Sequence, residues 1–414
     1  MFNQRTWILI TLYLILFLNF LGYFLTIPVL TEVIANPKFN LISEKYRALF
    51  GDYIFSIVLG VGSLAGFFFG PILGRLSDQI GRRKVLFICL FLTLISLILP
   101  IMGLVSSSIG LFALGNFFNG IASNNQPITQ AAITDLSFQT QRKAWRFALD
   151  TVVICAAMTL GPVLGEVLSD PSLSRWFTPN FPFFMAAILT VIAILLAFFL
   201  LKETNFITEK NKTNNKNKKW MSVGFKSFSD VLNIPVKIKK LLLVFVLAQT
   251  GWAAFFQYLY LYLSVHQGFS EKTLSVYMGL IGVYFILGLL LIYPWVLKYF
   301  SLMQGVRICL WLSFLSFFGL IIFKQNLALW LLPIPLTLGM GLYFPSLLTL
   351  FSDETEKNNQ GWILAVATSL IGVAWFVTGF SSIYLGHLGA QYPMVFSTAC
   401  LFFSAVLAGV KWKI

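Results

Sequence analysis

Charged residues are scarce in this sequence. They make up 11% of its 414 residues, whereas a soluble domain carries about 25%. This composition excludes an ordinary water-soluble globule, and apolar runs recur along the whole chain. Each run is close to the ~20 residues that a helix needs to cross ~30 Å of hydrocarbon. Because backbone polar groups in lipid must satisfy one another, runs of this length are expected to be helices.

Cysteine and histidine are also few. The four cysteines all fall inside apolar runs, and none has the spacing of a metal site or a redox pair. His266 and His387 lie in different loops, which argues against a histidine metal site or a nucleophilic triad. No glycine-rich phosphate-binding loop is present either, so ATP-driven transport by this chain alone is not expected. We therefore expect no cofactor, no metal and no enzymatic activity.

Twelve membrane helices are predicted from the apolar runs. Their approximate ranges are 7–30, 50–74, 84–103, 109–136, 147–168, 181–201, 241–264, 274–297, 306–323, 327–351, 361–385 and 393–411. The first run is too long for a cleavable signal peptide, so we interpret it as a retained helix. The fold class expected is an all-α membrane protein with two six-helix bundles.

Basic residues fall mainly on one side of this topology. With the N-terminus inside, most of the 29 Lys and Arg lie in cytoplasmic segments, which places both termini in the cytoplasm by the positive-inside rule. We expect a multi-pass protein of the cell inner membrane. The net charge of +14 then follows from topology and requires no nucleic acid partner.

A polar segment divides the chain in the middle. We predict an N-terminal bundle at 1–202, a basic cytoplasmic linker at 203–240 and a C-terminal bundle at 241–414. The linker contains the low-complexity run 210–219, which is either a solvated tether or a contact for anionic lipid headgroups. A weak internal repeat agrees with two halves, because one common shift places Pro71 on Pro294 and Arg75 on Lys298. Two such halves are one way to build alternating access.

The most specific motif lies between the second and third predicted helices. Residues 74–84 read GRLSDQIGRRK. Gly74 and Gly81 permit close approach and tight turning, and Asp78 is an acceptor suited to a helix N-terminus or an arginine. Arg82 and Arg83, with the lysine after them, hold the loop on the cytoplasmic side.

This loop resembles the signature of the major facilitator superfamily. The resemblance implies a conformational lock that holds the two halves together in the outward-facing state. In the family the acid of the motif meets the start of the eleventh helix, and an arginine meets an acid at the end of the fourth. Carried to this sequence, these are Asp78, Arg82 and Asp135, with the eleventh helix beginning near Gly361.

A second motif lies late in the fifth predicted helix. Gly161, Pro162 and Gly165 resemble the Gly-Pro-x-x-Gly-Gly stretch of drug:proton antiporters, including tetracycline-efflux proteins, although Glu166 stands where that family has its second glycine. Small residues allow close helix approach in a bilayer, and a packing face is the alternative interpretation. Residues 25–30 resemble the same subfamily more weakly.

Two departures from the family pattern bear on mechanism. Antiporters usually carry an arginine after a glycine in the fourth helix, and here that position is Asn116. The second half lacks the signature acid, because Ser301 aligns with Asp78. The first departure puts the usual scheme of proton coupling in doubt.

The fourth predicted helix carries a row of polar side chains. Spacings of three and four residues place them on one helical face, and Pro127 predicts a kink nearby. The row comprises Asn116, Asn119, Ser123, Gln126 and Gln130. We interpret this face as the lining of a substrate cavity, and hydrogen bonding between helices is the alternative.

The seventh predicted helix offers a second lining face. Its candidates are Gln249, Trp252, Phe256 and Tyr260. Aromatic residues with polar tips suit an amphiphilic ligand, although a stripe of this kind is also common in a core or against lipid. Tyr23, Tyr343 and Trp375 are further candidates of the same type.

Acidic residues within the predicted helices are rare. Glu166 and Asp52 lie toward the outer ends of two of them and are the candidates for proton coupling, because burial raises the pKa of a carboxyl. The alternative is an interfacial acid that reaches water. The predicted helices of the second half have no Asp, Glu, Lys or Arg in their interior. This favours neutral or amphiphilic substrates.

Three functions remain open at this point. The first is a proton-driven exporter of small amphiphilic compounds that works by alternating access. The second is a dedicated metabolite or siderophore transporter for export or uptake, favoured by the amide row and the missing arginine. The third is a non-transporting membrane receptor, which no residue favours. The expected partners are a small-molecule substrate, protons and membrane lipids, and without an oligomerisation signal we expect a monomer.

Overall fold

A computed structural model describes residues 4–35, 44–137, 139–205, 230–231, 233–269, 271–323, 326–389 and 391–410. These residues form helices and connecting turns, without strands in the described part of the chain. Ten of the described helices are long and apolar enough to cross a membrane. Many large apolar side chains on their outer faces are exposed, such as Phe68, Phe91 and Val163. Such faces require lipid rather than water around them.

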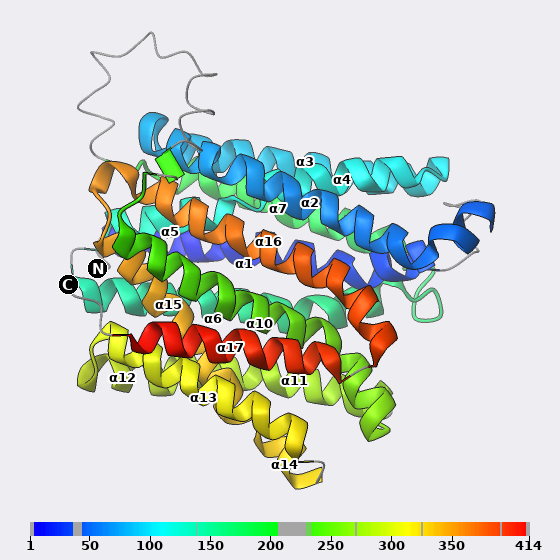
Figure 1. Cartoon of the computed structure of the whole chain (residues 1–414). Helices are drawn as coiled ribbons and strands as arrows, with labels where there is room; N and C mark the ends of the chain where they lie inside the picture. The colour runs from blue at the N-terminus through cyan, green and yellow to red at the C-terminus, as the bar shows by residue number, and fades with distance from the viewer. Residues whose placement is uncertain are drawn as a thin grey trace. The chain divides into compact units, whose positions relative to one another are not determined.

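The helices cluster into two compact units. The first unit holds α1 (Gln4–Ala35), α2 (Glu44–Ile80), α3 (Arg82–Ser106), α4 (Ile109–Ala122), α5 (Asn125–Asp135) and α7 (Phe181–Phe199), with the later part of α6 (Thr140–Ser169). It also includes η3 (Lys357–Asn359) and the start of α16 (Gln360–Leu388). Within it α4 packs against α2 and α3, and α7 packs against α1 and α3 (Figure 1).

The second unit holds the remaining helices. They are α10 (Val236–Gln267), α11 (Glu271–Leu287), the π-helix η2 (Gly288–Ile292), α12 (Tyr293–Tyr299), α13 (Leu302–Ile322), α14 (Asn326–Leu331), α15 (Pro333–Asp353) and α17 (Tyr392–Gly409). The first residues of α6 and the later part of α16 belong here. In this unit α17 lies along α10 and α13, and α15 packs against α13 (Figure 1).

The two units do not follow the predicted domain boundaries residue by residue, because α6 and α16 each contribute to both. The boundaries 1–202, 203–240 and 241–414 therefore stay a prediction. The basic run 210–219 lies outside the described residues.

The fourth predicted helix, expected over 109–136 with a kink near Pro127, is interrupted in the structure. It is two helices, α4 and α5, separated at Ser123 and Asn124. The break precedes Pro127, which lacks the N–H group that would bond the carbonyl of Ser123 in a continuous helix. The Asn124 side chain instead donates to the carbonyls of Ile121, at 3.0 Å, and of Gly120, at 3.4 Å. Backbone polar groups at the break are thus satisfied locally, as a membrane interior requires.

Glycines set the closest helix contacts of the first unit. A Cβ atom on Gly62 would lie 2.7 Å from the carbonyl oxygen of Asn116, and one on Gly120 would collide with the backbone of Gly62. These contacts bring α2 and α4 together at backbone distance, the usual means of helix association where lipid provides no hydrophobic drive.

Candidate functional site

The Asp78 carboxylate lies at the N-terminus of α16. Its two oxygens accept hydrogen bonds from the backbone N–H groups of Gly361, at 3.0 Å, and Trp362, at 2.9 Å. These N–H groups have no acceptor within their own helix. The positive end of the helix dipole also favours a carboxylate at this position. Asp78, at the end of α2, therefore acts as a helix cap for a segment 283 residues away.

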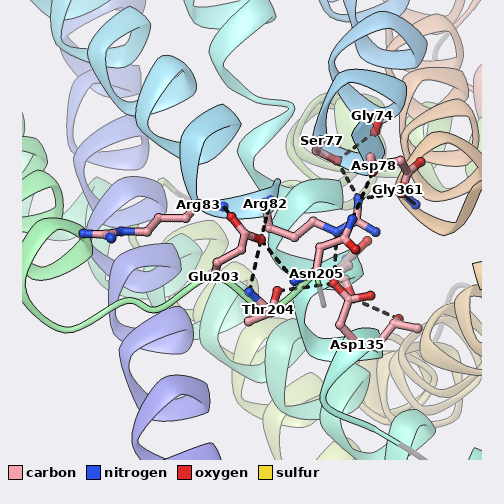
Figure 2. A network of polar contacts seen from close by, with 12 residues as sticks. Gly74, Ser77, Asp78, Arg82, Arg83, Asp135, Glu203, Thr204, Asn205 and Gly361 are labelled. Atoms are coloured by element: carbon pink, nitrogen blue, oxygen red, sulfur yellow. Dashed lines mark hydrogen bonds and ion pairs between the residues drawn. The ribbon is translucent and has the colours of Figure 1, made fainter. Parts of the chain in front are cut away.

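Arg82 joins Asp78 to a second acid. Its guanidinium lies 2.6 Å from Asp78 and 3.1 Å from Asp135, which ends α5. It also donates to the Ser77 hydroxyl at 2.7 Å. The side chains of Asp78 and Arg82 are each 3% exposed, so these charges interact with little screening by water. We call Asp78, Arg82 and Asp135, with the α16 N-terminus, the Arg82 network (Figure 2).

Two glycines allow this close approach. A Cβ atom on Gly361 would collide with the Arg82 guanidinium and would lie 2.9 Å from Asp78 Oδ1. A Cβ atom on Gly74 would lie 2.5 Å from both the Ala365 side chain and the Gly361 carbonyl oxygen. The ends of α2 and α16 meet at this distance only because both positions lack a side chain.

The pKa of Asp78 reflects opposing influences. Burial raises the pKa of its carboxyl above the ordinary value for aspartate, while Arg82 and the two backbone N–H donors act in the opposite direction. The charged carboxylate therefore depends on its partners, and removing Arg82 would leave a desolvated acid.

The antiporter-like motif in α6 packs against α1. A Cβ atom on Gly161 would collide with Phe24, and one on Gly165 would collide with the carbonyl oxygen of Leu25. Pro162 lies inside α6, which continues to Ser169. The structure thus brings together the two segments that resemble the antiporter subfamily, the α6 motif and the beginning of residues 25–30.

Three acids bear on proton coupling, and Asp150 among them was not predicted from the sequence. Glu166 is exposed on α6, and the Asp52 side chain lies outside the described residues. Asp150, also on α6, is 0% exposed. It lies about 15 Å along the helix from Thr140 at 1.5 Å per residue. Its apolar neighbours in sequence were the signal that could have identified it. The predicted helix began at 147, so only the structure places this acid well inside a helix.

The amide row is split by the break between α4 and α5. Asn116, Asn119 and Gln126 are half-buried, Ser123 is exposed, and Gln130 is fully buried. Beside the row, Asn125 donates to the Asn19 carboxamide oxygen at 2.6 Å, and Asn19 donates to Thr93. Hydrogen bonding between helices, the alternative interpretation, thus describes Asn125, while three amides of the row keep partly accessible faces.

The aromatic candidates of α10 form part of a cluster in the second unit. Trp252 contacts Phe285 with ring centroids 5.2 Å apart, and Phe256 contacts Trp375 at 6.0 Å. We call these four half-buried residues the aromatic cluster. Gln249 is buried, and nothing is described of the Tyr260 side chain. The cluster offers ring faces of the kind that bind flat apolar groups.

A second ion pair was not foreseen from the sequence. Lys143, near the start of α6, donates to Asp353 at 2.6 Å and to the Ser352 hydroxyl at 3.0 Å. The side chains of Lys143 and Asp353 are 8% and 27% exposed. Because 210 residues separate the partners, no local spacing in the sequence could have indicated the pair.

Comparisons with known proteins agree with this architecture. The family model described as Major Facilitator Superfamily matches residues 12–382. Tetracycline resistance protein, class B, from Escherichia coli is 25% identical over 325 residues, which cover 76% of this chain and 75% of that protein. Multidrug resistance protein 2 from Bacillus subtilis (strain 168) is 23% identical over 397 residues, covering 95% and 92%.

A solved structure shares the fold. The crystal structure of the human organic anion transporter MFSD10 (TETRAN) matches with a TM-score of 0.80 and 18% identity, and the match covers 98% of this chain and 100% of that one. The chain is a multi-pass membrane transporter and not an enzyme. With its signature motif across the end of α2 and the start of α3, and a family match over most of its length, it belongs to the major facilitator superfamily.

Proposed function

We propose that this protein is a secondary active transporter that exports small amphiphilic compounds in exchange for protons, by alternating access. The observation that carries the proposal is the Arg82 network, in which the signature loop and the α16 N-terminus are joined by ions and backbone hydrogen bonds. The resistance proteins that match most of the chain support an efflux function. The chain is expected in the cell inner membrane as a monomer, with both termini cytoplasmic and lipids around it.

The Arg82 network acts as the conformational lock of the cycle. Its bonds hold while the substrate site faces outward, and the α16 N-terminus leaves Asp78 when the cytoplasmic side opens. A buried ion network of this kind has two discrete states, because partial separation leaves desolvated charges without partners. Gly74, Gly81 and Arg83 belong to the same loop and keep it in the required geometry.

The aromatic cluster and the amide row supply the substrate contacts. In the second unit, the ring faces of Trp252 and Phe256 suit apolar groups of a ligand. In the first unit, the half-buried amides of Asn116, Asn119 and Gln126 suit polar groups. Each set lies within one unit.

Proton coupling needs a carboxyl that changes its environment during the cycle. Asp150 is the strongest candidate, since a buried acid in a membrane helix is costly and is retained for a function. Glu166 and Asp52 remain the candidates predicted from the sequence.

The test is proton flux in energised everted vesicles challenged with a broad panel of compounds. Proton release on addition of several unrelated amphiphiles is expected for the unmodified protein, and its absence in Asp78→Asn shows that the flux depends on the lock. Asp150→Asn is expected to abolish exchange, and Glu166→Gln serves as the comparison. Exchange that is unchanged in Asp150→Asn would remove that residue from the mechanism.

A dedicated metabolite or siderophore transporter is the second candidate. The half-buried amides favour it, because they suit a polyhydroxylated or carboxylated ligand. This function would replace export of amphiphiles if the folded protein gave no proton flux with any amphiphile of the panel but gave flux with a single citrate-like or sugar-like compound.

A further inference from the structure

The N-terminus of α3 has no cap of its own. Gly81 is the residue before the helix and contributes no side-chain hydrogen bond. The Glu203 carboxylate, just beyond α7, supplies the missing acceptors. It accepts hydrogen bonds from the backbone N–H groups of Arg82, at 2.8 Å, and Arg83, at 3.2 Å. A carboxylate at this position satisfies the free N–H groups and complements the helix dipole.

Both the backbone conformation and the contact with Glu203 require glycine at position 81. Its φ of 107° is a conformation that favours glycine. A Cβ atom there would also collide with the Glu203 carboxylate. The second glycine of the signature motif thus leaves room for an acid that comes 121 residues after Arg82 in the chain.

The next two residues bind the rest of the network. The Thr204 hydroxyl donates to Asp135 Oδ2 at 3.3 Å, and the Asn205 side chain donates to the Asp78 carbonyl oxygen at 3.0 Å. Thr204 and Asn205 are buried. We call residues 203–205 the clasp. Three consecutive residues therefore contact the start of α3, the end of α5 and the end of α2 (Figure 2).

We propose that Glu203 is a positioning residue of the transport cycle, which holds the N-terminus of α3 so that Arg82 meets Asp78 and Asp135. The proposal rests on the function proposed above for the Arg82 network. The rigid backbone carries the effect: Arg82 is both the first residue of α3 and the centre of the network. When Glu203 is lost, the start of α3 no longer holds Arg82 in position to bind Asp78 and Asp135. The α16 N-terminus then separates from Asp78 more often.

Hydrogen exchange of the Gly361 and Trp362 amides tests this directly. Both amides donate to Asp78, whereas the Glu203 carboxylate accepts from Arg82 and Arg83. In the full chain, Glu203→Ala is expected to raise their exchange rate about fivefold, the effect of losing one helix cap. Glu203→Gln, which keeps one acceptor oxygen and the side-chain length, is expected to restore part of the protection. Unchanged exchange in folded Glu203→Ala protein would overturn the proposal.

Glu354→Gln is the matched control. It removes the charge of an exposed carboxylate that pairs with Lys237 at 2.8 Å in the second unit, and it should leave the exchange of Gly361 and Trp362 unchanged. A rise of equal size in this variant would show a general loss of stability and overturn the positioning role. If Glu203→Ala does not fold, Thr204→Val and Asn205→Ala test the other contacts of the clasp, and no rise in either would contradict the proposal.

A double variant separates positioning from general stability. Adding Glu203→Ala to Asp78→Asn is expected to raise exchange no further, because the contact that Glu203 supports is already broken. If the fold-changes in exchange rate of the two single variants multiply in the double variant, the proposal is contradicted. These readouts need no substrate, so a failure to detect transport of any compound would weaken the proposed function and leave this test intact.

Discussion

The Arg82 network and the Lys143–Asp353 pair tie distant parts of the chain in different ways. The first joins two acids, one guanidinium and two backbone N–H groups, and its central ion pair is 3% exposed on both sides. The second is a single ion pair with one added hydroxyl, and its acid is 27% exposed. Because its charges are buried, the Arg82 network is expected to be either fully formed or fully broken. In the Lys143–Asp353 pair, water can take the place of a lost partner.

Glycine accounts for much of this difference. Gly74 and Gly361 let the backbones of α2 and α16 approach until the charges are sealed from water. In the second unit the position that aligns with Asp78 is Ser301, whose hydroxyl accepts from the backbone N–H of Gln304 in a capping box. The residue that would correspond to Arg82 is Gly305. The second half thus has a capped helix start at this place, without the acid and the base.

The largest effect is expected from Arg82→Ala. It leaves Asp78 and Asp135 desolvated without their shared cation, and the free energy of unfolding should fall by about 3–5 kcal/mol. Thermal unfolding and transport measured together check this. Arg142→Ala, at an exposed position, is the control, and equal losses in both variants would contradict the special role of the network.

A smaller but specific effect is expected from Gly361→Ala. The added methyl group collides with Arg82, so overpacking should cost about 1–3 kcal/mol and reduce transport. Gly379→Ala, on the same helix with its nearest neighbour at 3.8 Å from the new atom, should be neutral or slightly stabilising. Thermal unfolding of the two variants separates the cost of the contact with Arg82 from the effect of helix propensity. Equal changes in stability would refute the role of this contact.

The Lys143–Asp353 pair is expected to contribute less. Lys143→Met should cost about 1–2 kcal/mol, between the values of exposed and of fully buried pairs. A double-mutant cycle with Asp353→Asn measures the coupling. The exposed Lys237–Glu354 pair provides the reference and should give at most about 0.5 kcal/mol. Equal coupling in the two pairs would mean that burial does not distinguish them.

The smallest effect is expected from Ser301→Asp. The new acid restores the residue that aligns with Asp78, but aspartate and serine cap helices almost equally well, so stability should change by no more than about 0.5 kcal/mol. Transport should stay unchanged, because Gly305 offers no cation to a new acid. A clear gain or loss in either measurement would show that the second half retains a latent network.

Most of the fold was predictable because lipid imposes helices on any long apolar run. The membrane class, the transporter function and the family were predicted from composition and from residues 74–84, and they are confirmed. The kink predicted near Pro127 in the fourth helix is a full break between α4 and α5, at which the Asn124 side chain satisfies the local carbonyls.

The buried face of each helix could not be predicted in the same way. In water, apolar periodicity marks the side that faces the core. In lipid both the core and the surroundings are apolar, so Glu166 and Asp150 on α6 look alike in sequence although one is exposed and the other fully buried.

By itself the sequence determined that this chain crosses a membrane as helices and carries a superfamily signature, because both depend on short-range patterns. Tertiary structure alone decided which distant residues complete that signature. Glu203 binds the N-terminus of α3, Gly361 leaves room for Arg82, and Lys143 pairs with Asp353 only after the chain has folded. The physical reason is that buried ions and helix ends take their partners from whatever folding brings near, at any separation along the chain.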